Sequence, residues 1–166
     1  VLAAGMLRAD TIFNVNPSRI VGHPQLTLLS SSPNLVEGRE VNSPQGIAAD
    51  TSVTPPILYV ADTGNNRILA WRNAATFANG ASADLVIGQA NKYATTALGP
   101  GTSVTTGMSY PTSVAVDAKG NLYVTDAGNN RILRFPKPFE QPADSILPDM
   151  VIGQKTFSAK SPNQGL

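Results

Sequence analysis

The chain contains no cysteine and one histidine in 166 residues, and only 14% of its residues are charged. The absence of cysteine excludes disulfide bonds, thiolate chemistry and cysteine-ligated zinc. The formal net charge is +1, and the lysines and arginines are spread along the chain rather than clustered. No apolar run approaches the roughly 18 residues that a membrane-spanning helix needs. We therefore expect neither a nucleic-acid partner nor insertion into a membrane.

The sequence is rich in turn-forming residues and repeats itself. It has 14 glycines and 13 prolines, although 42% of the residues are hydrophobic. Residues 58–71 read LYVADTGNNRILAW, and residues 122–135 read LYVTDAGNNRILRF. Two apolar runs around a Gly-Asn-Asn centre are typical of two antiparallel strands joined by a tight turn. The chain is therefore built from copies of one structural unit.

Each copy extends beyond this hairpin on both sides. Pro44 and Asp50 match Pro111 and Asp117, but three additional residues of the first copy fall in the turn-prone segment 51–56. A further element, Val-Ile-Gly-Gln, ends both copies at 86–89 and 151–154, and it occurs a third time as Ile-Val-Gly-His at 20–23. The expected strands are 46–49, 58–61, 67–71 and 85–87, followed by 113–116, 122–125, 131–135 and 150–152. Four antiparallel strands over about 40 residues form one blade of a β-propeller.

The predicted fold class is therefore all-β, a β-propeller segment of four-stranded antiparallel blades. The nearly continuous apolar strands indicate that both faces of each sheet are covered. The expected organisation is a segment 1–23 that ends in the outer strand of a preceding or closing blade, complete blades at 44–88 and 111–153, long inter-blade loops at 24–43 and 89–110, and the start of a further loop at 154–166.

The motif PxxVAVDxxGNLYVxDxGNNRI at residues 111–132 resembles the NHL repeat. The first copy departs from it mildly, at Ala49 and at the Pro55-Pro56 insertion. The resemblance covers about residues 44–88 and 111–153 and implies a propeller, usually of six blades. The Val-Ile-Gly-Gln elements are similar to those of NHL arrays in large exported bacterial proteins of unassigned function. This resemblance implies a secreted or periplasmic location, and residues 1–9 are either the remnant of a signal peptide or an ordinary strand.

The repeated turn has two interpretations, a calcium loop or a structural turn. Its residues are Asp62, Gly64, Asn65, Asn66 and Arg67 in the first copy, and Asp126, Gly128, Asn129, Asn130 and Arg131 in the second. High-affinity calcium sites use several carboxylates, whereas each turn supplies one. A carboxylate that accepts backbone N–H bonds explains the same residues, so we predict structural turns. The two arginines are expected to pair with a carboxylate or carbonyl between blades.

Neither a catalytic residue nor a metal or cofactor site is predicted. His23 is the only histidine, and Gln89 and Gln154 occupy its position in the other copies, which indicates a hydrogen-bonding role. No Gly-x-Ser-x-Gly nucleophile motif is present. The alternative is a propeller enzyme, because some NHL-like propellers resemble amidating lyases or lactonases. Its catalytic residues would then lie in blades that this chain does not contain.

The favoured function is a non-catalytic binding or interaction scaffold within a larger exported protein. Both long loops join the outermost strand of one blade to the innermost strand of the next, so they are expected to cross the same face. Tyr93 and Tyr110 lie in the 89–110 loop and are the candidate contacts for a protein or glycan ligand. Two blades alone would expose apolar faces at both ends, so closure is expected to need further blades in cis or homo-oligomerisation.

Overall fold

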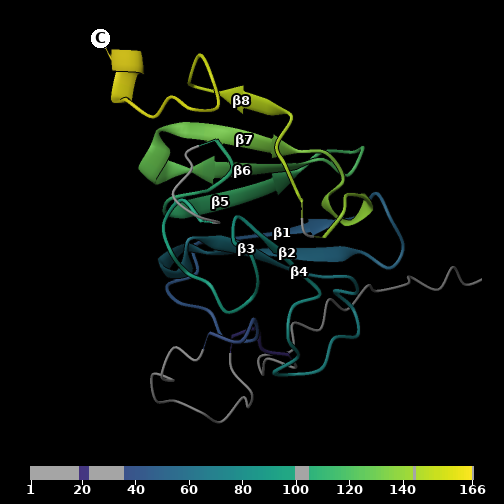
Figure 1. Cartoon of the computed structure of the whole chain (residues 1–166). Helices are drawn as coiled ribbons and strands as arrows, with labels where there is room; N and C mark the ends of the chain where they lie inside the picture. The colour runs from purple at the N-terminus through teal and green to yellow at the C-terminus, as the bar shows by residue number, and fades with distance from the viewer. Residues whose placement is uncertain (1–18, 23–35, 100–104, 144, 166) are drawn as a thin grey trace, which may run out of the picture.

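The computed structural model describes residues 19–22, 36–99, 105–143 and 145–165, and it contains two four-stranded antiparallel sheets with the strands in chain order (Figure 1). Blade 1 consists of β1 (Gly46–Asp50), β2 (Ile57–Asp62), β3 (Arg67–Trp71) and β4 (Leu85–Ile87). Blade 2 consists of β5 (Pro111–Val116), β6 (Leu122–Asp126), β7 (Arg131–Phe135) and β8 (Met150–Ile152). The helical elements among the described residues are short 3-10 turns: η1 (Thr63–Asn65), η2 (Ala127–Asn129), η3 (Pro138–Glu140) and η4 (Pro162–Gly165). The predicted all-β fold is confirmed.

The Gly-Asn-Asn centre of each copy forms the same compact turn. Asp62 pairs with Arg67 across β2 and β3, and Asp126 pairs with Arg131 across β6 and β7. Between them lie η1 and η2, which end at Asn66 and Asn130 with φ of +54° and +53°. Asparagine tolerates this left-handed conformation better than most residues, which explains its place in the repeat.

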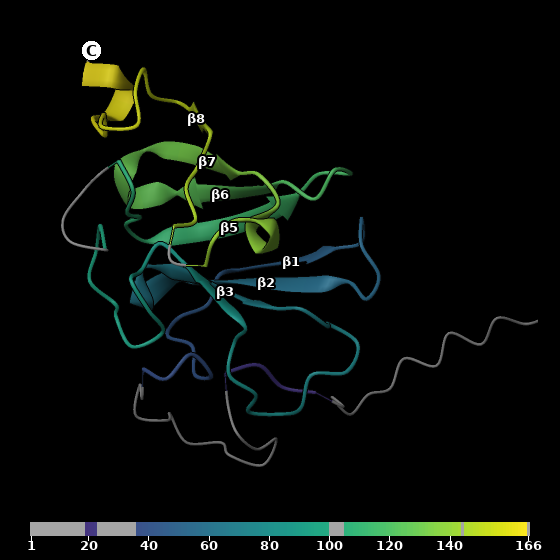
Figure 2. The same cartoon turned by 45° about the vertical axis from the view of Figure 1, so that its right-hand side comes forward.

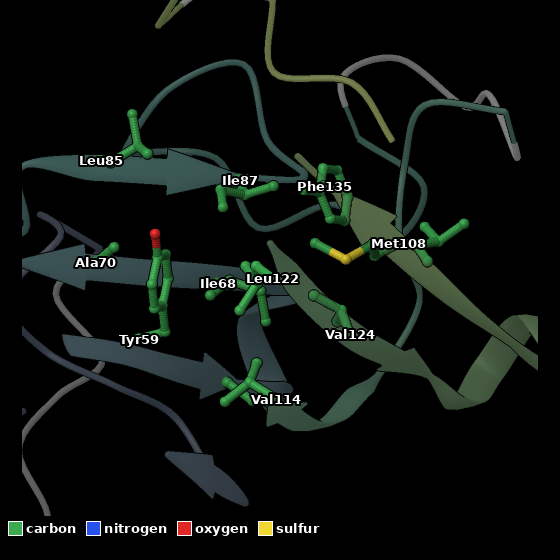
Figure 3. Packing of buried hydrophobic residues seen from close by; sticks show 12 residues of the cluster. Tyr59, Ile68, Ala70, Leu85, Ile87, Met108, Val114, Leu122, Val124 and Phe135 are labelled. Atoms are coloured by element: carbon green, nitrogen blue, oxygen red, sulfur yellow. The ribbon is translucent and has the colours of Figure 1, made fainter. Parts of the chain in front are cut away.

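The two blades stack face to face, and their contact forms the main hydrophobic core (Figure 3). Tyr59, Ile68 and Ile87 of blade 1 pack against the face of blade 2 that carries Leu122 and Phe135. All five side chains are at most 1% exposed. The innermost strands β1 and β5 lie side by side, so the blades are joined along their inner edges as well as through this core (Figures 1 and 2).

The outward face of blade 1 is also covered, contrary to the expectation of two open ends. Leu58, Val60, Leu69 and Trp71 form a second cluster and are at most 9% exposed. The segment 72–84 between β3 and β4 folds over this cluster. Phe77 lies 6.1 Å from Trp71 between ring centroids, and the indole N–H of Trp71 donates to the carbonyl of Ala81 at 3.0 Å. We refer to the segment 72–84, together with Val21 and Val41, as the cap of blade 1.

The outward face of blade 2 has no such cover among the described residues. Ile87 and Ile152 occupy the same position in the two copies, yet Ile87 is 0% exposed and Ile152 is 47% exposed. Leu85 and Met150 differ in the same way, at 6% and 37%. Blade 2 covers the first member of each pair, whereas the second member faces outward. We call this surface of blade 2 the open face.

The predicted outer strand at 20–23 lies only partly within the described residues. Gly22 forms a single parallel bridge with Glu40, and Val21 packs on the second cluster. Residues 19–22 therefore lie against segment 72–84, with Val21 as part of the cap. A role for the segment in a preceding or closing blade stays a prediction, and His23 lies outside the described residues.

The inner strands β1 and β5 approach each other closely at Gly46, and a substitution there tests this contact. A Cβ atom at Gly46 would lie 2.8 Å from the Cα of Ser113 and 3.0 Å from the carbonyl oxygen of Thr112, both backbone atoms. Gly46→Ala must therefore move β1 away from β5. We expect a loss of about 1–3 kcal/mol in the free energy of unfolding, measured by urea denaturation.

Ala49→Ser on the exposed side of β1 is the control, with an expected change within about 0.5 kcal/mol. If Gly46→Ala were as stable as the parent, the contact between the inner strands would not hold the blades together.

Candidate functional site

The aspartate of each repeated turn is a buried hydrogen-bonding centre. Asp62 accepts the backbone N–H of Asn42 at 2.6 Å through Oδ1 and the Nε of Arg67 at 2.6 Å through Oδ2. The amide of Asn65 donates to the same carboxylate at 2.9 Å. Both side chains of the Asp62–Arg67 ion pair are 0% exposed. The carboxylate is thus saturated by protein donors, one of which comes from the loop that precedes blade 1.

The second copy repeats this arrangement. Asp126 accepts the backbone N–H of Ser109 at 2.7 Å, the Nε of Arg131 at 2.7 Å and the amide of Asn129 at 2.8 Å. The recurrence of donors at matched positions supports the structural interpretation of the turn over the calcium loop. Among the described residues, no group of three or more histidine and acidic side chains is arranged to hold a metal ion.

The arginines use their remaining N–H groups to fasten the loops on both sides of each blade. Arg67 donates to the carbonyls of Lys92 at 2.6 Å and Glu40 at 3.4 Å. Arg131 donates to the carbonyl of Gly107 at 2.8 Å and also to that of Phe157. The carboxylate and carbonyl partners are of the expected kind. The carboxylate belongs to the arginine's own blade, whereas the carbonyls lie in the inter-blade loops on either side of it.

The glutamine of each Val-Ile-Gly-Gln element holds the loop that follows it. Gln89 Nε2 donates to the carbonyls of Asn66 at 3.0 Å and Thr96 at 2.8 Å. Gln154 Nε2 donates to the matching carbonyls of Asn130 at 3.0 Å and Ser161 at 2.9 Å. The amide of Asn66 adds a bond to the carbonyl of Thr95. The turn, the glutamine and the loop start therefore form one hydrogen-bonded unit.

Tyr93 and Tyr110 lie on loops at the same end of the blades as η1 and η2, and we call this end the loop face. Tyr93 is 64% exposed, and the ammonium of Lys92 lies 5.6 Å from its ring centroid. Tyr110 is 50% exposed, and its backbone N–H donates to the side chain of Asn66 at 2.9 Å. Both candidate side chains thus project from backbone that the repeat itself holds in place.

A cleft of about 490 Å³ lies between the blades at the opposite end, beside the β1–β2 and β5–β6 turns. Blade 1 lines it with Asp50, Tyr59 and Arg72, and blade 2 lines it with Lys119, Lys137 and Phe139. Sequence reasoning missed this site. The available signal was the insertion at 51–56, because Ser52, Val53, Thr54 and Pro55 form one wall of the cleft.

Tyr59 is fully buried at this cleft, and its hydroxyl has no hydrogen-bond partner among the described residues. Burial, reinforced by the nearby Asp50 carboxylate, raises the pKa of its phenol above the ordinary value. The hydroxyl therefore stays protonated at neutral pH and remains a donor. An unpaired buried donor is costly, so it marks a place where the fold is not optimised for stability alone.

One family model matches the chain, that of the NHL repeat, over residues 108–135. This chain contains an NHL repeat. The matched residues run through β5, β6, η2 and β7, including the Asp126–Arg131 turn. Residues 58–71 share the LYV-x-D-x-GNNRIL sequence of that NHL repeat. No curated protein matches the sequence, and no helix among the described residues is long and apolar enough to span a membrane.

Asp126→Ala tests the structural role of the turn. The substitution leaves the Arg131 guanidinium buried without its carboxylate, and removing one member of a buried ion pair typically costs about 3–5 kcal/mol. We expect a loss of this size in the free energy of unfolding, equal with calcium and with a chelator.

Asp149→Ala breaks the matched exposed pair with Arg134, whose side chains are 42% and 26% exposed. A hydrogen bond from the Arg134 guanidinium lowers the pKa of Asp149, but solvent screening limits the expected loss to about 1 kcal/mol. A loss in Asp126→Ala that appears only with calcium would instead identify a metal site.

Proposed function

We propose that the chain is a non-catalytic binding scaffold whose loop face contacts a protein or glycan ligand. The observation that carries the proposal is the presentation of two exposed tyrosines, Tyr93 and Tyr110, by loops that buried side chains fasten to the blade. Tyrosine is favoured at binding surfaces because its ring supplies apolar contact area while its hydroxyl bonds to polar groups.

The hydrogen bonds of the turn support this function through preorganisation. Arg67 and Gln89 bind carbonyls on either side of Tyr93, at Lys92 and at Thr96. Asn66 joins the two loop segments, because its side chain contacts the carbonyl of Thr95 and the N–H of Tyr110. A loop that is already ordered loses less conformational entropy on binding, so more of the contact energy contributes to affinity.

The tyrosine contacts are tested by comparing the parent chain with a Tyr93→Ser/Tyr110→Ser variant. Each protein is applied to a glycan array. In a second experiment, each is cross-linked in cell extract, and the cross-linked partners are identified by mass spectrometry. We expect the parent to retain a ligand, cross-linked at the loop face, that the variant binds at least tenfold more weakly. Thermal unfolding should be nearly unchanged, because both side chains are exposed.

A variant with Val53→Ser, an exposed residue at the opposite end of the blades, controls for general loss of exposed apolar surface. An identical set of ligands for the parent and the double variant would exclude the loop face as the binding surface.

We further infer that the open face of blade 2 receives another blade. The reason is the internal comparison of Ile87 with Ile152 and of Leu85 with Met150, in which the same positions are buried in blade 1 by blade 2 itself. The partner is therefore a sheet that presents an apolar face such as that of Leu122, Val124, Leu133 and Phe135. In this chain that face is buried against blade 1, and the matching face of blade 1 lies under the cap. In a solution of this chain alone, the open face of a second copy is therefore the available partner.

Light scattering tests this docking. We expect the chain to associate at micromolar concentration and Ile152→Lys to weaken the association at least tenfold, since a lysine at the interface must be desolvated. Ile47→Lys is the matched control, because Ile47 is an exposed isoleucine, at 67%, on blade 1. A stable monomer for the parent would show that the open face needs no partner.

A further inference from the structure

The cleft between the blades differs from the loop face in position and in chemistry. It lies at the other end of the strands, and residues of both blades line it, so a ligand there would bridge the blades. Phe139 of blade 2 lies 6.4 Å from Tyr59 of blade 1 between ring centroids, and the Arg72 guanidinium stacks 4.3 Å from the Phe139 ring centroid. The cleft thus combines an aromatic floor with charged side chains at its mouth.

The charges of the cleft are unevenly matched. Lys137 pairs with Glu140 at 3.0 Å, and the Asp50 carboxylate accepts the backbone N–H of Ser52 at 2.9 Å and its hydroxyl at 2.6 Å. Within the described ranges, no carboxylate lies within ion-pair distance of the Arg72 guanidinium or the Lys119 ammonium, and both side chains line the cleft. Two cations from different blades therefore remain without a carboxylate partner.

The two copies of the repeat also differ at the tyrosine of the floor. In blade 2, the Tyr123 hydroxyl lies 3.4 Å from the Asp117 carboxylate, as a hydrogen-bonded pair. In blade 1, the matching carboxylate of Asp50 binds Ser52 instead, and Ser52 belongs to the 51–56 insertion. The Tyr59 hydroxyl is left without a partner. The insertion thus both builds a wall of the cleft and frees a donor at its floor.

We propose that this cleft binds a small organic anion through Arg72 and Lys119 from opposite blades, with the Tyr59 hydroxyl as the third donor. A carboxylate or phosphate oxygen accepts from all three groups. Tyr59 lies beneath the surface, beside the exposed Arg72 side chain. Because Tyr59 is 0% exposed, side chains packed around it have to shift before its hydroxyl can reach the anion.

Calorimetric titration with citrate tests the site, with sodium chloride holding the ionic strength constant. We expect saturable binding of one citrate per chain to the parent. Arg72→Gln and Lys119→Gln should each weaken it about fivefold, the effect of losing one solvent-accessible charge pair. Lys160→Gln removes the same charge at the loop-face end, where the Lys160 carbonyl binds Asn130, and should change the affinity less than twofold.

Tyr59→Phe tests the contribution of the hydroxyl to citrate affinity separately from that of the two charged side chains. Without citrate, we expect a higher melting temperature than that of the parent, because an unpaired buried hydroxyl is removed. With citrate, the affinity should fall as the third donor is lost. Three outcomes would overturn the proposal: no saturable binding to the parent, equal losses in Lys160→Gln and Arg72→Gln, or an unchanged affinity in Tyr59→Phe.

Discussion

The buried Asp–Arg pair of each repeated turn is the interaction on which the rest of the structure depends. The aspartate closes the hairpin between the second and third strands and binds a backbone N–H of the preceding loop. The arginine extends the same network to carbonyls of the loops before and after the blade. A buried ion pair contributes little net stability by itself, because desolvation offsets much of the attraction. Here its additional hydrogen bonds fix where the loops leave the sheet, and so where Tyr93 and Tyr110 are presented.

Much of the fold could be predicted because each strand has a local signal. Apolar runs and the Gly-Asn-Asn turn locate the middle strands, and the identical order of elements in two copies locates the outer ones. The cap of blade 1 had no such signal. Segment 72–84 consists mostly of small and polar residues without a strand or helix period, and its packing depends on Phe77 and Ala83 meeting the outward face of blade 1. Its position follows from tertiary contacts alone.

The candidate sites divide in the same way. The turn residues could be named from the repeat, and the two tyrosines from their place in the loop between the predicted blades. The inter-blade cleft could not, since it requires Arg72 and Lys119, from separate copies, to come together. The free hydroxyl of Tyr59 is less predictable still. Its equivalent in blade 2, Tyr123, bonds to the Asp117 carboxylate. The difference arises because the matching carboxylate of Asp50 bonds to Ser52 instead.

The hydrogen bonds from buried side chains to the loops have a consequence for the motion of the loop backbone. Gln89 and Arg67 bind carbonyls of segment 92–96, and Asp62 and Asp126 bind the N–H groups of Asn42 and Ser109. These loop amides are held by side chains that are themselves buried in the blade. Their exchange with solvent hydrogen is therefore governed by opening of the whole blade rather than by local fluctuation of a loop. The boundary between rigid and mobile backbone does not coincide with the boundary between strand and loop.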